Sequence, residues 1–86
     1  MLMRFTIEQR HLTDVHGKPV SDREAAVSFH SREAESADEA ARGFASEIAA
    51  EVIGDILKFP GFHAVATMRS PEGVFTVQVT PASLAP

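Results

Sequence analysis

Three residues near the end of the first predicted strand have the types and the spacing of metal ligands. His11, Asp14 and His16 form an H-x2-D-x-H cluster, and neutral imidazoles with a carboxylate can hold zinc or another divalent ion, with water in the open position. Polar connectors also contain such residues without binding a metal, and a flexible loop orients ligands poorly. The cluster therefore predicts a metal site only as the alternative hypothesis, and we expect no cofactor.

A second group of polar residues is predicted on one face of a sheet. His30, His63, Arg4 and Arg10 fall at outward positions of alternating segments. Two imidazoles beside Glu8 would form a ligand site with acid–base or pH-sensitive character. In the strand order that we favour, one strand separates the two histidines by roughly 10 Å, which is too far for direct contact. The other interpretation is a polar face in contact with solvent.

No catalytic residue is predicted. The chain has no cysteine, which excludes disulfides, thiolate-bound zinc and thiol catalysis. Its serines lie in no nucleophile elbow, and no glycine-rich loop could hold a phosphate. The sequence therefore predicts a protein that is not an enzyme.

Length and charge limit the partners that we expect. At 86 residues the chain forms one domain, and a domain this small buries only roughly 60% of its unfolded surface. The net charge is −4, and Trp and Tyr are absent, so the basic footprint and the stacking platforms of nucleic-acid binders are lacking. No segment approaches the ~20 apolar residues of a membrane span. We expect a cytoplasmic protein that binds neither a membrane nor nucleic acid.

The longest predicted element is an amphipathic helix in residues 36–61. Ser36 and Glu39 have the spacing of a capping box, and Pro60 with Gly61 prevents continuation of the helix. Apolar residues at helical spacing fill a broad face, which is typical of a helix that lies across a sheet. They are Ala41, Phe44, Ala45, Ile48, Ala49, Val52, Ile53 and Ile56.

Segments of alternating polarity predict two strands on each side of this helix. The four segments are residues 3–12, 24–31, 62–69 and 74–80. The turn at 70–73 is predicted to pair Met68 with Phe75 and Arg69 with Val74, because that register keeps one face of the hairpin apolar.

The fold class that follows is α+β. We expect a single four-stranded ββαββ sheet with one long amphipathic helix packed on one face, in residues 1–80, and a flexible tail at 81–86. Val27 and Phe29 are predicted to face the helix, and His30 to face away from it. For the four strands in chain order we favour the arrangement 2-1-3-4, in which every neighbouring pair is antiparallel. The alternative places the second and third strands side by side.

Two surfaces are candidates for contact with a partner. On the outer side of the predicted helix two glycines lie nearly in line, and each costs about 1 kcal/mol relative to alanine, a cost that close approach of a partner helix would justify. On the uncovered sheet face two valines interrupt the polar residues, so that face could pack on a second sheet. The interface positions are Gly43, Glu47, Ala50, Gly54, Val65 and Val74.

These features predict a small, non-catalytic protein–protein interaction module. The partner is expected to be a second copy of the chain, in a homodimer, or another protein, in an adaptor, immunity or antitoxin-like role. The alternative is a metal- or small-ligand-binding domain that uses the histidines of the loop and the sheet face.

Overall fold

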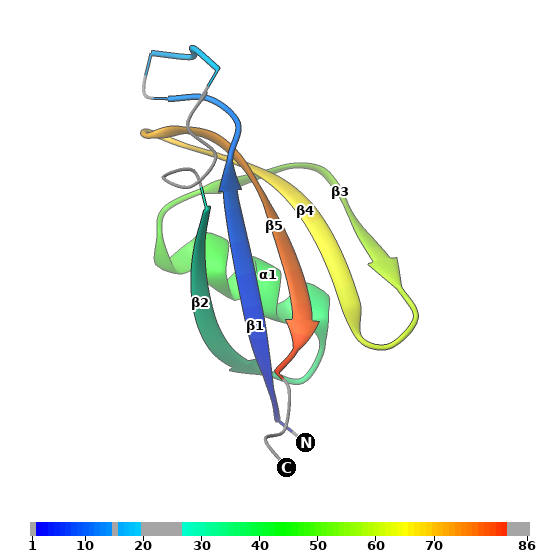
Figure 1. The fold of residues 1–86 in the computed structure, drawn as a ribbon. Coiled ribbons are helices and arrows are strands. Elements are labelled where there is room, and N and C mark those ends of the chain that lie inside the picture. Colours follow the sequence, from blue (N-terminus) through cyan, green and yellow to red (C-terminus); the bar gives the residue numbers. More distant parts are fainter. Residues whose placement is uncertain (1, 15, 20–26, 83–86) are drawn as a thin grey trace.

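The protein is built on one antiparallel sheet with a short helix across one face (Figure 1). The computed structural model describes residues 2–14, 16–19 and 27–82. Five strands are hydrogen-bonded in the order β2-β1-β5-β4-β3. The elements along the chain are β1 (Met3–His11), β2 (Val27–Ala34), α1 (Ala37–Glu47), β3 (Glu51–Phe59), β4 (His63–Ser70) and β5 (Gly73–Pro81). No described helix is long and apolar enough to cross a membrane.

The prediction of a four-stranded sheet with one long helix is wrong, because the helix ends at Glu47 and a fifth strand follows it. The end of α1 has the hydrogen bonds of a Schellman motif: the Ala50 amide donates to the Ala45 carbonyl and the Ala49 amide to the Ser46 carbonyl. This motif needs a left-handed residue directly after the helix, and Ala49 adopts that conformation with φ 56°. Glycine usually occupies this position. Because this position is an alanine, the sequence lacks the usual glycine signal for the end of the helix.

The residues after the helix would destabilise a longer helix and are better accommodated in a strand. Had the helix continued, Glu47, Glu51 and Asp55 would have formed like-charge pairs at i, i+4, which destabilise a helix. In β3, Glu51 instead lies opposite Arg69 and forms an ion pair with it, with Nη2 and Oε2 3.0 Å apart. Gly54 adopts φ +72° within an irregularity of the β3–β4 register between Ile53 and Leu57. This positive φ explains why the position is a glycine, whereas an α-helix would not require glycine there.

The β4–β5 hairpin has the predicted register, whereas the strand order differs from the one that we favoured. Met68 lies opposite Phe75 and Arg69 opposite Val74. All neighbouring strands are antiparallel, as expected. However, β5 rather than β4 lies beside β1. The reason is the extra strand: α1 crosses the sheet from β2 at one edge to β3 at the other, and the chain then returns by successive hairpins until β5 closes against β1 (Figure 1).

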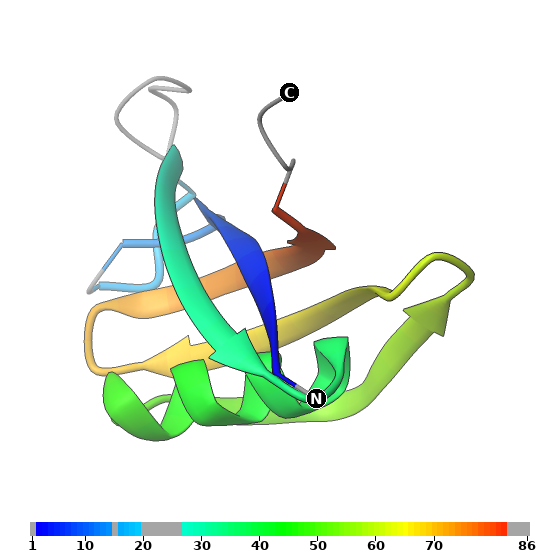
Figure 2. The same ribbon diagram turned by 90° about the horizontal axis from the view of Figure 1, so that it is seen from below.

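The core lies between α1 and one face of the sheet, as Figure 2 shows. Small residues on the helix, among them Ala40 and Ala41, let it lie close to the strands. The Ser36 side chain caps the helix by accepting a hydrogen bond from the Glu39 amide, as predicted. The largest fully buried side chains all come from the sheet; they are Phe5, Phe75, Ile7, Met68, Val77 and Val79.

The faces of β2 are the reverse of the prediction. His30 lies opposite Ile7, and directly opposite residues of an antiparallel pair share a face. His30 therefore lies on the helix side, where its ring packs against Phe44 with a centroid distance of 4.8 Å, and Phe29 lies on the other side, 66% exposed. The reason is that the strand continues to Ala34, whose burial under the helix sets the alternation for the whole strand.

Candidate functional site

The sheet face turned away from α1, here called the open face, is covered by no described helix or strand (Figure 2). Outside the β3 irregularity, the charged residues at its described strand positions are three arginines and three glutamates. Each arginine pairs with one glutamate within the chain, and the pairs are Arg4–Glu33, Arg10–Glu8 and Arg69–Glu51. Outside the β3 irregularity, which contains Asp55, the open face is thus electrically balanced, although the whole chain has a net charge of −4.

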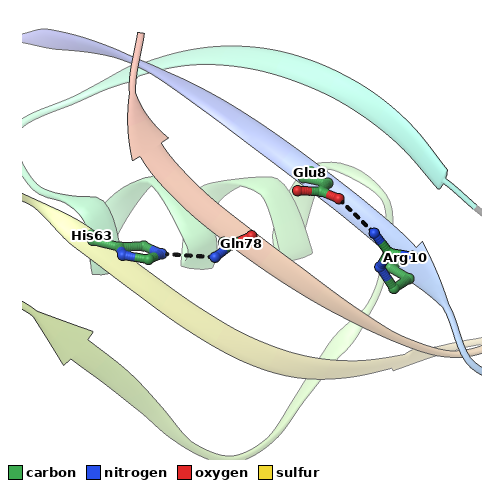
Figure 3. A network of polar contacts seen from close by, with 4 residues as sticks. All are labelled: Glu8, Arg10, His63 and Gln78. Carbon is green, nitrogen blue, oxygen red and sulfur yellow. Dashed lines mark hydrogen bonds and ion pairs between the residues drawn. The ribbon is translucent and has the colours of Figure 1, made fainter.

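A shallow hollow of about 230 Å³ crosses the middle of the open face. Two polar contacts lie around it (Figure 3): Arg10 Nη2 is 3.0 Å from Glu8 Oε1, and Gln78 Nε2 is 3.1 Å from His63 Nε2. Val65 lines the hollow on the β4 side. These four side chains therefore already have polar partners within the chain.

Large apolar side chains gather at one edge of the open face. Ile53, Leu57 and Phe59 lie opposite Thr67, Val65 and His63, which alternate with the buried residues of β4 and hence point away from the helix. Their exposures are 39%, 56% and 46%, and Phe62 in the following turn is 57% exposed. These four residues, here called the β3 apolar patch, are four of the seven large apolar side chains exposed in the described part of the chain.

The strand that carries the patch is an edge strand with a built-in irregularity. β3 is hydrogen-bonded only to β4, so its other edge has free backbone groups. Two extra residues between Ile53 and Leu57 break its register, and a bulge of this kind twists an edge away from further strand pairing. The patch is therefore better suited to contact through its side chains than to the addition of another strand.

The residues proposed as metal ligands are not grouped by the structure. Among the described residues no three histidine, cysteine or acidic side chains are placed to share an ion. The Asp14 carboxylate accepts hydrogen bonds from the backbone amides of Lys18 and His16. The Lys18 amide is the main reason that the pKa of Asp14 is lowered, followed by the His16 amide, while desolvation opposes the shift. The His11 ring packs against Phe75, 5.6 Å between centroids.

The predicted ligand group is divided between the two faces of the sheet. Arg4, Arg10 and His63 lie on the open face, and each contacts a neighbour within the chain. His30 lies on the helix side, where its Nε2 is 3.1 Å from Gln9 Oε1. The two histidines therefore do not form one site, because β2 presents the opposite face from the one predicted.

The positions predicted to contact a partner helix either pack within the chain or lie outside α1. A Cβ on Gly43 would lie 2.5 Å from Arg32 Nε, so this glycine makes room for the Arg32 guanidinium, which pairs with Glu47. Ala50 follows the helix end, and Gly54 lies in the β3 irregularity. The close approach at Gly43 is therefore internal to the chain.

The sheet positions of the predicted interface lie where expected, and a larger apolar group beside them was missed. Val65 and Val74 both belong to the open face. Ile53, Leu57 and Phe59 were assigned to a helix or its end, because Val52, Ile53 and Ile56 also fit helical spacing. Enrichment in β-branched and aromatic residues around a glycine was the signal for a strand. No protein-family model, curated protein or solved structure matches this chain.

Proposed function

We propose that the chain is a non-catalytic protein–protein interaction module that forms a homodimer, with the open faces of two copies packed against each other at their β3 apolar patches. The observation that carries this proposal is the combination of an apolar patch with a charge-balanced face. A two-fold interface brings the same surface of both copies together, so that surface must be compatible with itself.

The charges of the open face are compatible with self-association, and the apolar patch is what favours that face. The helix side also carries ion pairs within the chain, Asp38 with Lys58 and Glu47 with Arg32, so charge alone does not choose between the two sides. On the open face every arginine–glutamate pair is closed within one copy. Two such faces can meet without net repulsion between these pairs.

The area of the β3 apolar patch fits a small dimer interface. With about 200 Å² for each large side chain, the exposed fractions of the four residues correspond to roughly 400 Å² of apolar surface on each copy. A patch of this size on one molecule is commonly functional. Two copies would cover roughly 800 Å², and stable interfaces bury about 1,200–2,000 Å². Neighbours on the open face such as Val65 and Thr67 would supply the difference.

Sedimentation velocity over a concentration series tests the proposal. We expect the wild-type chain of 9.3 kDa to sediment at twice that mass at micromolar concentration. Leu57→Asn removes one apolar side chain of the patch, and we expect at least a tenfold weaker dimer, because full burial of a leucine side chain contributes about 1.5–3 kcal/mol and the dimer loses this contact in both copies. Leu2→Asn is the matched control, since Leu2 and Leu57 are similarly exposed, at 61% and 56%.

Three results would count against the proposed dimer. A wild-type monomer at 100 μM would contradict self-association through this patch. A dimer that Leu57→Asn leaves intact would place the contact elsewhere on the molecule. A monomer that gains mass only with another protein would show that the patch binds a different partner.

A further inference from the structure

A cavity separate from the hollow of the open face lies on the helix side of the sheet. We propose that it binds a small organic cation with a hydrogen-bond acceptor at its other end. The cavity has a volume of about 390 Å³, within the range of small-molecule sites in proteins. Its walls come from the end of β1, the C-terminal end of α1 and the β4–β5 turn. This inference is independent of the proposed homodimer.

The cavity exists because α1 lies across the strands and covers only part of their length (Figure 1). A helix with its side chains is about 10–12 Å wide, whereas the nine residues of β1 extend over about 30 Å. The inward side chains of β1 are apolar where α1 covers the strand and polar where it does not. Phe5 and Ile7 lie fully buried under the helix, whereas Gln9 and His11 line the cavity beyond it.

Gln9 supplies a fixed hydrogen-bonding group on the cavity wall. It is 8% exposed and is the one buried polar residue in the described part of the chain. Its Oε1 accepts a hydrogen bond from Ser28 Oγ at 3.1 Å and lies 3.1 Å from His30 Nε2. These two neighbours hold the carbonyl end of the amide toward β2. The NH₂ end donates to no acceptor among the described residues, and it could therefore donate to an acceptor atom of a ligand.

The charges around the cavity favour a cation. Glu72 in the β4–β5 turn is the one acidic residue among the described residues that line the cavity, and none of those residues is a lysine or an arginine. Ile48 and Ala49, at the C-terminal end of α1, also line it, and this end of a helix bears the negative pole of the dipole. Ile48 and Pro71 add apolar surface for the body of a ligand. An anion of the same shape would meet the Glu72 carboxylate and be repelled.

Two probes with the same ring and opposite charge test the inference. We would titrate the isotopically labelled full chain with 4-hydroxybenzylammonium and with 4-hydroxybenzoate at pH 7.5, and follow the backbone amide resonances by NMR. We expect saturable shifts at residues 9, 11, 48–49 and 70–72 with the ammonium compound, and an affinity at least fivefold weaker for the carboxylate. The phenol oxygen of both compounds can accept a hydrogen bond from Gln9.

Glu72→Gln is the variant that isolates the charge. Glu72 is exposed in a turn, so its replacement leaves the core intact, and Glu51→Gln on the open face is the matched control. We expect Glu72→Gln to weaken the ammonium compound by about fivefold, the upper range for an exposed ion pair, and Glu51→Gln to leave it unchanged. The inference fails if the ammonium compound causes no saturable shifts at 10 mM, if both probes bind equally, or if the shifts fall outside the cavity.

Discussion

Replacement of Ala49 by glycine should stabilise the protein, because the helix ends in a conformation that alanine tolerates poorly. Ala49 has φ 56°, and the left-handed region costs a residue with a Cβ about 1–2 kcal/mol. Glycine removes that cost but adds freedom to the unfolded chain, which takes back about 0.4–1 kcal/mol. The difference is a gain of about 0.5–1 kcal/mol in the free energy of unfolding. For a domain of this size that gain raises Tm by about 2–8 °C.

The assay is thermal and urea unfolding followed by circular dichroism, with both proteins at the same concentration so that any dimer contributes equally. Ser46→Gly is the control, since Ser46 is exposed and lies inside α1, where glycine should lower stability by roughly 0.5 kcal/mol. The sign of the Ala49→Gly effect tests the reasoning. If residue 49 belonged to a longer helix, glycine would cost about 1 kcal/mol, and a fall in Tm for both variants would refute a helix end at Glu47.

Two further perturbations follow from the contacts of the fold. Gly73→Ala should lower the free energy of unfolding by more than about 2 kcal/mol, because the new Cβ would lie 2.4 Å from the Thr13 carbonyl oxygen at φ +130°, where the backbone cannot easily move. Urea unfolding measures this free energy. A decrease below about 0.5 kcal/mol would contradict the packing of the Thr13 segment on the β4–β5 hairpin. Asp38→Asn should be less stable than the wild type at pH 7, with the difference disappearing in acid. The Ser36 hydroxyl, and to a lesser extent the Lys58 ammonium, lower the pKa of Asp38 in the folded chain. The carboxylate therefore stabilises the fold at pH values above its pKa in the unfolded chain, near 3.8. This contribution is lost as the pH falls through the lower pKa of the folded state. Unfolding free energies between pH 7 and pH 2 measure the difference, and one that is equal at both ends would show that the charge of Asp38 has no role.

The parts of the fold that the sequence predicted correctly rest on signals with one physical meaning. Ser36 followed three residues later by Glu39 identified the start of the helix, and the Ser36 side chain does cap it. In the β4–β5 hairpin, only one register keeps the apolar residues on one face, so Met68 and Phe75 were paired correctly. Both inferences depended on neighbouring residues alone.

The errors arose where one pattern had two meanings or where a signal was absent. Val52, Ile53 and Ile56 fit a helix as well as a strand, and the left-handed residue that ends the helix is Ala49 rather than glycine. The like charges and Gly54, which looked costly on a helix, were the indications against it. The strand order could not be predicted, because it depends on where β3 lies. With β3 unrecognised, the exposed apolar side chains of the candidate interface were missed as well.

The central claim is that two copies meet through their open faces at the β3 apolar patch. An isotope-filtered nuclear Overhauser experiment on a mixture of labelled and unlabelled chains tests it directly, because only contacts between copies give signals. We predict signals between copies at the methyl groups of Ile53, Leu57 and Val65, and none at Ala40 or Ala41 beneath the helix. Signals confined to α1 or β2, or none at a concentration where the protein is dimeric, would contradict the claim.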